Sequence, residues 1–146
     1  MTEATTSSLE ALKAYAAADE MRNGGGETES IPLFQHAIDL DPNFALAYAR
    51  LAAIYSNVGE GDRSVEVAKK AFDLRERVSE RERYYITDHF YTATGDIEKQ
   101  KETLELATKA YPNDSAAFGN LAIVYGQRSR VKIAKCLIAG FLIARF

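Results

Sequence analysis

The stretch YARLAAIY at residues 48–55 recurs 70 residues later as FGNLAIVY at residues 118–125. In both stretches large apolar residues and an alanine stand at offsets 0, 3, 4 and 7, which lie on one face of an α-helix. These residues are Tyr48, Leu51, Ala52 and Tyr55, then Phe118, Leu121, Ala122 and Tyr125. Each stretch begins six residues after a proline, Pro42 or Pro112, so the chain contains an internal repeat.

The distance of 70 residues divides into 36 and 34, because Tyr84 and Tyr91 occupy the outer positions of a middle copy. A fainter copy lies 34 residues upstream of the first stretch. A period of this size indicates a solenoid of helical hairpins, in which a single hairpin cannot bury its apolar face and must stack on its neighbours. Small residues such as Ala71 would let the stacked helices approach closely.

Turn and capping residues divide the chain into helices at the same period. Gly59 and Gly95 follow the last tyrosine of their stretches by four residues, where a left-handed residue can end a helix. Ser79 and Glu82 have the spacing of a capping box, and Ser7 with Glu10 has the same spacing at the first helix. Another helix is expected to start at Pro42, and no strand is needed anywhere.

These features together resemble the tetratricopeptide repeat family. The resemblance implies an all-α, right-handed superhelical solenoid of antiparallel helix hairpins over residues 1–127. Its copies would span about 10–42, 43–78, 79–112 and, in part, 113–127, with residues 128–146 as a separate basic and apolar segment. The order of segments is also similar to repeat arrays appended to bacterial serine/threonine kinases and winged-helix regulators, although no kinase motif occurs in this sequence.

Composition and charge limit the class of protein. The net charge is −3, and residues 128–146 carry +5, so residues 1–127 carry −8. An acidic body argues against a nucleic-acid surface, which needs clustered lysine and arginine. The single cysteine, Cys136, cannot form an internal disulfide, and the N-terminus lacks the pattern of a secretory signal, so a cytoplasmic location is expected.

The family resemblance also implies where a partner would bind. In that family the first helix of each hairpin lines a concave groove that holds a peptide or protein. Carried over to this sequence, the groove residues are Arg50, Ala53 and Asn57, then Tyr85, Ile86 and His89, then Asn120, Ile123 and Gln127. Only Arg50, Asn57 and Asn120 resemble the residues that grip a terminal carboxylate in some members, so that binding mode is not expected.

No catalytic or metal-binding constellation is apparent. His36 and His89 are 53 residues apart on different hairpins and have no nucleophile nearby. Cys136 stands in an apolar stretch, where a thiol tends to remain protonated and unreactive. We therefore expect a protein that is not an enzyme and that needs no cofactor or metal.

The segment 128–146 does not follow the repeat. It lacks a turn glycine after Gln127, and its uninterrupted apolar part, residues 136–144, is nine residues long, too short to span a membrane. Three interpretations remain open: an incomplete repeat, a segment that lies on an anionic membrane, or a chain end altered by truncation or a change of reading frame.

The sequence thus predicts a non-catalytic scaffold that binds a protein or peptide through the groove. A regulatory extension of a signalling kinase or transcriptional regulator is the first alternative, and a peripheral membrane adaptor that uses the tail is the second. Neither the partner nor the oligomeric state follows from the sequence.

Overall fold

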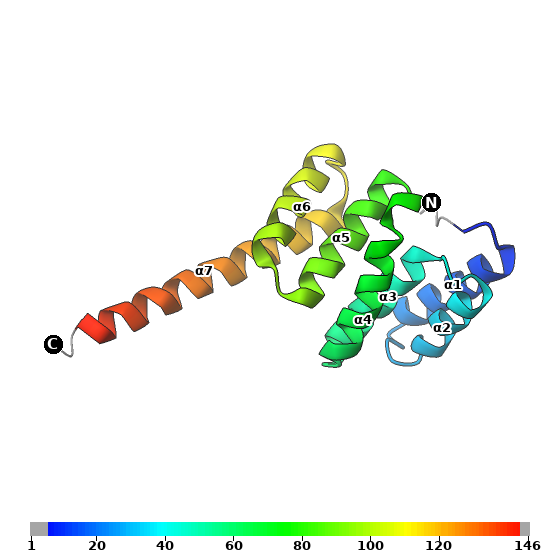
Figure 1. Ribbon diagram of the computed structural model, residues 1–146, viewed down its shortest axis with the longest axis horizontal. Coiled ribbons are helices and arrows are strands. Elements are labelled where there is room, and N and C mark those ends of the chain that lie inside the picture. Colours follow the sequence, from blue (N-terminus) through cyan, green and yellow to red (C-terminus); the bar gives the residue numbers. More distant parts are fainter. Residues whose placement is uncertain (1–5, 144–146) are drawn as a thin grey trace. The chain divides into compact units, whose positions relative to one another are not determined.

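The computed structural model describes the backbone of residues 6–143 and the side chains of residues 6–127, 129 and 130. Within residues 6–143 the chain forms α-helices and one short 3-10 helix, with no strand (Figure 1). The helices are α1 (Leu9–Asn23), α2 (Ile31–Leu40), α3 (Ala45–Asn57), α4 (Gly61–Asp73), η1 (Arg75–Arg77), α5 (Glu80–Thr94), α6 (Ile97–Ala110) and α7 (Ser115–Ile143). The predicted all-α class is confirmed.

The chain divides into two compact units. Unit 1, Met1–Asp96, contains helices α1 to α5, and unit 2, Ile97–Phe146, contains α6 and α7. In unit 1, α1 packs with α2 and α3 packs with α4 as hairpins, and α5 packs on both α3 and α4. The repeat period assigns residues 79–112, and so both α5 and α6, to one copy. In the structure α5 belongs to unit 1 and α6 to unit 2.

Several helix ends follow the local sequence signals. Ser79 and Glu82 form the expected capping box: the Ser79 side chain accepts from the backbone N–H of Glu82, and the Glu82 carboxylate accepts from the backbone N–H of Ser79. Gly59 and Gly95 have φ angles of +83° and +74°, the left-handed conformation that ends a helix without a Cβ clash.

Two other helix starts differ from the prediction. Ser8, not Ser7, caps α1, because its Oγ lies 3.1 Å from the backbone nitrogen of Ala11 and accepts that hydrogen bond. The third helix starts at Ala45 and not at Pro42, because Asp41 instead accepts from the backbone N–H of Asn43 in a turn.

Aromatic side chains hold α1, α2 and α3 together. Tyr15 meets Phe34 edge to face at a centroid distance of 5.4 Å and meets Phe44 at 5.0 Å, and Phe34 and Phe44 are fully buried. Burying a side chain of this size stabilises the fold by roughly 1.5–3 kcal/mol. This cluster fixes the position of Tyr15, and hence the face that α1 presents to α3.

Small residues let α3, α4 and α5 come close. Ala45, Ala49 and Ala71 are at most 1% exposed and surround Ile86. The buried Ser64 Oγ donates a 2.8 Å hydrogen bond to the backbone carbonyl of Ala52, so α4 is bonded directly to the backbone of α3. Close approach through alanine and serine is therefore the basis of the α3–α4 hairpin.

The residues predicted to pack between repeats differ in burial from copy to copy. Leu51, Ala52, Tyr55 and Ala71 are buried, whereas Tyr48, Tyr84, Tyr91 and Leu121 are half-buried and Phe118, Ala122 and Tyr125 are exposed. The same pattern on a helix therefore lies under cover in residues 48–55 and largely open in residues 118–125.

Unit 2 consists of one short and one long helix. Leu104 on α6 and Val124 on α7 are at most 2% exposed and belong to the buried side of this pair. The helix α7 continues without a turn past Gln127 to Ile143, and in Figure 1 it extends well beyond α6. At 1.5 Å per residue it is about 43 Å long against about 21 Å for α6, so α6 can lie along only half of it.

The alternatives for residues 128–146 depend on side chains that, except for Ser129 and Arg130, lie outside the described residues, and Cys136 is among the side chains not described. For the helices of residues 6–143, none combines the length and the apolar character that crossing a bilayer requires.

The left-handed turn at Gly59 gives a test of the hairpin. Replacing Gly59 with alanine should lower the free energy of unfolding by about 1 kcal/mol, because a Cβ disfavours positive φ. Gly61, two residues away, has no positive φ and no atom within 4 Å of an added Cβ, so Gly61→Ala is the matched control and should be neutral or slightly stabilising. Urea denaturation of both variants measures the difference, and equal effects would contradict the assigned turn.

Candidate functional site

A network of polar side chains centred on Arg50 joins α1, α3 and α5. The Arg50 Nε donates to the Tyr15 hydroxyl at 3.0 Å, and its Nη1 donates to the Tyr85 hydroxyl at 3.0 Å. The guanidinium carbon also lies 4.8 Å from the centre of the Tyr85 ring, and Nε is 3.5 Å from the Asp19 carboxylate. One cation is therefore matched by two hydroxyls, an aromatic face and a carboxylate.

The protonation states of this network follow from its burial. Burial raises the pKa of Tyr15 to about 12, although the nearby Arg50 opposes the shift. Burial also raises the pKa of Tyr85, against the same opposing effect of Arg50. For Arg50 burial acts to lower the pKa, but Tyr85, Tyr15 and Asp19 outweigh it and the pKa is raised. At neutral pH the centre is thus a fixed positive charge between two neutral hydroxyls.

A second polar link lies where α1 ends. The Asn57 side chain on α3 donates a 2.7 Å hydrogen bond to the Glu27 carboxylate, and the same oxygen is 3.5 Å from Arg22 Nε on α1. Within the described residues, Arg22 Nε and Asp19 Oδ1 are buried without a hydrogen-bond partner, so they are held by ion pairs alone. These two atoms retain hydrogen-bonding capacity.

His89 completes the network on α5. Its ring lies 4.1 Å from the Tyr85 ring, and its Nδ1 is 2.9 Å from the Tyr85 carbonyl oxygen and 3.6 Å from the Asp88 carboxylate. Because a carbonyl only accepts, the Nδ1–H donates this hydrogen bond. Burial lowers the pKa of His89 despite the opposing effect of Asp88, and the positive charges of Arg50 and Arg22 lower it further.

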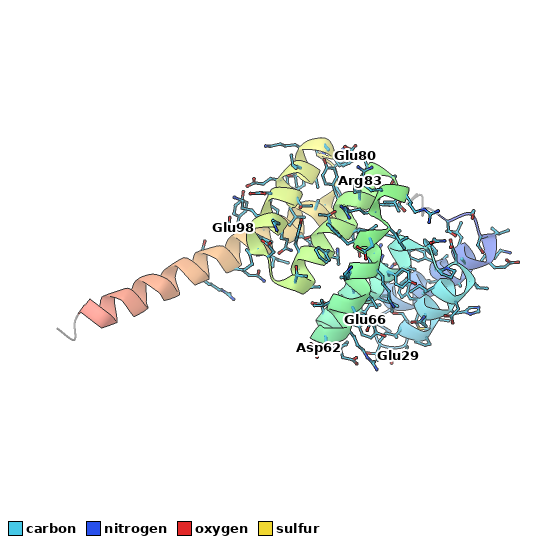
Figure 2. The ribbon with its side chains drawn as sticks, viewed as in Figure 1. Glu29, Asp62, Glu66, Glu80, Arg83 and Glu98 are labelled. Atoms are coloured by element: carbon cyan, nitrogen blue, oxygen red, sulfur yellow. The ribbon has the colours of Figure 1, made fainter. Side chains whose placement is uncertain are left out.

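This network differs from the ordinary charged surface of unit 1. Glu29, Glu66 and Glu80 are exposed charged side chains labelled in Figure 2. In contrast, the Arg50 side chain is only 20% exposed and the Asp88 side chain only 3%. Ordering partly buried charges in this way identifies the face of α1, α3 and α5 as the candidate site.

The predicted groove residues of unit 1 do not all lie on this face. Arg50, Tyr85 and His89 are joined in the network, and Ala53 is half-buried. Asn57 instead bonds to Glu27, which pairs with Arg22. Ile86 is 1% exposed and packs among alanines of α3 and α4, so its side chain is not available to a partner.

The remaining predicted residues lie on α7 in unit 2. Asn120 is half-buried, Ile123 is 60% exposed and Gln127 is exposed. They remain a predicted contact surface that belongs to unit 2 alone.

Sequence reasoning missed the contribution of α1, namely Tyr15, Asp19 and Arg22. A signal for it does exist, because Tyr15, Arg50 and Tyr85 are each separated by 35 residues, one repeat period. The alanine-rich sequence of α1 concealed this register. A search for tyrosines 35 residues before and 35 residues after Arg50 would have found this contribution.

The described residues offer no assembled centre for metal chemistry. Among them no group of three or more His, Cys, Asp or Glu is placed to hold a metal ion. His36 is exposed on α2, whereas His89 lies on α5. Hydrogen bonding and steric complementarity are what the arrangement around Arg50 can supply.

Comparisons with known proteins agree with this architecture. Residues 33–65 and residues 89–114 each match a family model of the tetratricopeptide repeat. No curated protein sequence matches the chain.

Solved structures with the same fold include two tetratricopeptide repeat domains and one chaperone in complex with a peptide. The first such domain of Spaghetti (RPAP3), bound to an HSP90 peptide, has a TM-score of 0.63 and 18% identity and covers 85% of this chain and 99% of its own. The Sgt2 domain from Aspergillus fumigatus has a TM-score of 0.62 and 17% identity, and the match covers 86% of this chain and 83% of its own. The Yersinia enterocolitica type III secretion chaperone SycD, in complex with a peptide of the translocator YopD, has a TM-score of 0.58 and 18% identity, and the match covers 88% of this chain and 97% of its own. At these identities the likeness establishes the solenoid fold.

The Arg50 network can be tested by removing the cation. Arg50→Met should lower the free energy of unfolding by about 2 kcal/mol, because it leaves the hydroxyls of Tyr15 and Tyr85 and the carboxylate of Asp19 without their partner. Arg63→Met is the matched control, since Arg63 is 65% exposed and should cost less than about 0.5 kcal/mol. Urea denaturation compares them, and similar losses would contradict a central role for Arg50.

His89 should make stability depend on pH. Since its pKa in the folded state lies below the unfolded value of about 6.5, the unfolded chain binds a proton first as the pH falls. Stability should therefore be highest above pH 6.5 and decrease as the pH falls below that value. His89→Asn should flatten this part of the unfolding free energy measured from pH 7.5 to 5, whereas the exposed His36→Asn should leave it unchanged. Unchanged slopes in both variants would contradict the assignment.

Proposed function

We propose that this chain, two stretches of which match tetratricopeptide repeat models, is a non-catalytic scaffold that binds a peptide or protein segment across the face formed by α1, α3 and α5. The observation that carries the proposal is the Arg50 network, which orders polar side chains of these three helices on one face. A face ordered before binding loses less side-chain entropy when a partner docks.

The chemistry of the face favours an extended segment of mixed polarity. Arg50 and Arg22 are already matched by Asp19 and Glu27, so neither is a free cation that waits for an anionic group. A partner held by its terminal carboxylate is therefore disfavoured. The half-buried Ala53 has a small side chain, at which the backbone of a partner can approach α3 closely.

Residues of α7 in unit 2 are proposed as further contacts. Ile123 offers an exposed apolar group, the exposed Gln127 offers an amide that can bond to a peptide backbone, and the half-buried Asn120 lies on the same helix. This part of the proposal is independent of the network in unit 1.

The proposal is tested by blocking the face without disturbing the network. Peptides are selected from a random display library on the wild-type chain, and their Kd values are measured by fluorescence anisotropy. Ala53→Arg should weaken binding more than about tenfold, because the added side chain occupies the space of the partner. Ala17→Arg, on the exposed side of α1, is the matched control and should leave the Kd unchanged.

Two outcomes count against the proposal. Selected peptides that bind Ala53→Arg as tightly as wild type must dock elsewhere. A chain that yields no binding peptide, while circular dichroism shows it to be helical, is not a peptide scaffold of this kind.

A further inference from the structure

The imidazole of His89 uses one ring nitrogen inside the protein and leaves the other free. Its Nδ1–H donates to the Tyr85 carbonyl oxygen at 2.9 Å, so in the neutral ring Nε2 carries a lone pair and no proton. Among the described residues Nε2 has no hydrogen-bond partner, and the atoms that are both buried and unpartnered are Asp19 Oδ1 and Arg22 Nε. With the His89 side chain 14% exposed, Nε2 is an acceptor that a partner can reach.

Packing holds this acceptor in one orientation. The His89 ring lies 4.1 Å from the Tyr85 ring, whose hydroxyl is bonded to Arg50 at 3.0 Å. A half-turn of the imidazole would put a carbon in place of Nδ1 beside the Tyr85 carbonyl and lose that hydrogen bond. An acceptor fixed in this way discriminates between partners, because a segment that covers Nε2 without a donor leaves it unpaired.

The groups around the ring keep it neutral. Burial is the main reason that the pKa of His89 lies below its ordinary value, and the positive charges of Arg50 on α3 and Arg22 on α1 lower it further. Asp88 opposes this shift from the Nδ1 side of the ring, where its carboxylate is 3.6 Å away. At neutral pH Nε2 therefore accepts a hydrogen bond and cannot donate one.

A neutral acceptor at this place selects the chemistry of the partner. A carboxylate or a phosphate only accepts, so placing one opposite Nε2 brings two lone pairs together. An ammonium or guanidinium group donates, but it loses hydration on docking and adds a charge near Arg50 and Arg22. A hydroxyl or amide side chain donates without carrying a charge, so it is the group that matches Nε2.

The position of His89 makes a side chain the part of a partner that reaches it. Because α4 packs on both α3 and α5 and joins them through short connections, α3 and α5 run in the same direction. Ala53 and His89 each lie about one turn beyond Arg50 and Tyr85, the residues that join the two helices. Packed helices lie about 8–10 Å apart, so a segment whose backbone lies at Ala53 extends a side chain to His89.

We propose that His89 is a specificity-determining residue of this face, and that its Nε2 accepts a hydrogen bond from a hydroxyl or amide side chain of the bound segment. The inference rests on the proposed function, because it needs a segment docked at Ala53. The segment then carries serine, threonine, asparagine or glutamine opposite His89, whereas aspartate or phosphoserine at that position is rejected.

The experiment removes the donor and the acceptor separately. Peptides selected on the wild-type chain are resynthesised with each hydroxyl or amide residue changed in turn to an apolar residue of similar size, and their Kd values are measured at pH 7.5. His89→Phe keeps a ring beside Tyr85 but has no acceptor, whereas the amide oxygen of His89→Gln can still accept. His36→Asn changes the exposed histidine of α2 and is the matched control. Circular dichroism checks that each variant keeps its helix content.

One position of the peptide should couple to His89. Loss of its donor should weaken binding to the wild type about threefold to tenfold, and His89→Phe should weaken binding of the unaltered peptide by a similar factor. When both changes are made, the second should add little to the first. His89→Gln should bind within about threefold of the wild type, and His36→Asn should bind as the wild type does. Aspartate at the coupled position should bind less tightly than the apolar residue.

A spectroscopic measurement separates this contact from a merely structural role of His89. In protein labelled with ¹⁵N-histidine, the Nε2 signal of His89 should be that of an unprotonated nitrogen near pH 7. It should shift when the unaltered peptide binds, because its lone pair then accepts a hydrogen bond. The peptide without the donor should leave this signal close to its position in the free protein, and the nitrogens of His36 should not shift.

Failure of this inference is distinct from failure of the proposed function. If Ala53→Arg weakens binding while His89→Phe binds every peptide as tightly as wild type, the face holds the segment and Nε2 takes no part. A protonated Nε2 in the free protein near pH 7, or peptides that prefer aspartate at the position coupled to His89, would also overturn the inference. If Ala53→Arg binds as tightly as wild type, the proposed function itself is wrong.

Discussion

A single guanidinium in the middle of unit 1 joins three helices that are far apart in sequence. Arg50 comes from α3, and its hydrogen-bond partners Tyr15 and Tyr85 come from α1 and α5. A charge that is only 20% exposed on its side chain must be matched inside the protein, because burial without partners costs several kcal/mol. This requirement fixes the rotation of α1 and α5 about their axes relative to α3.

The same requirement determines what the face can bind. Because Arg50 donates to the hydroxyls of Tyr15 and Tyr85 and its charge is balanced by Asp19, the face presents directed hydrogen bonds instead of a free positive charge. The pKa of His89 is lowered mainly by burial, and the positive charge of Arg50 lowers it further. Stability and partner chemistry thus share one cause in unit 1, whereas the protonation of His89 depends mainly on burial.

The same sequence pattern is buried in residues 48–55 and largely exposed in residues 118–125. On α3, Leu51, Ala52 and Tyr55 are buried, and α4 bonds to the backbone of Ala52 through Ser64, whereas Tyr125 of the matching pattern on α7 is 45% exposed. The turn after α3 decides this, since Gly59 with φ +83° lets the chain reverse. Composition therefore specifies a packing face, and chain direction decides whether the chain itself covers it.

Local signals were predictable wherever one backbone conformation or one short-range bond decided the outcome. The capping box at Ser79 and Glu82 and the left-handed Gly59 and Gly95 follow from spacing, because the groups that bond are three to five residues apart. The cap of α1 was wrong by one residue because Ser7 and Ser8 carry the same hydroxyl and only the geometry selects Ser8.

The longer-range features could not be predicted in the same way. Ile86 packs among alanines, and its neighbour Tyr85 bonds to Arg50. Which of the two faces the core depends on the rotation of α5 about its axis, and the helix pattern alone leaves this rotation uncertain by one residue. The straight course of α7 had only the absence of a turn glycine as its signal. Repeat spacing thus predicts which helices pack, and side-chain contacts decide which residues they present.

The most direct measurement is a double-mutant cycle between Arg50 and Tyr85. Tyr85→Phe is made in the wild-type chain and in the Arg50→Met chain, and the free energy of unfolding is determined for all four proteins. If Arg50 is the link between α3 and α5, removal of the hydroxyl costs about 1 kcal/mol in the wild type and is neutral or stabilising once Arg50 is gone, because the hydroxyl then lacks its partner. The same cost in both backgrounds would show that the hydroxyl and the guanidinium act independently, and would contradict the account.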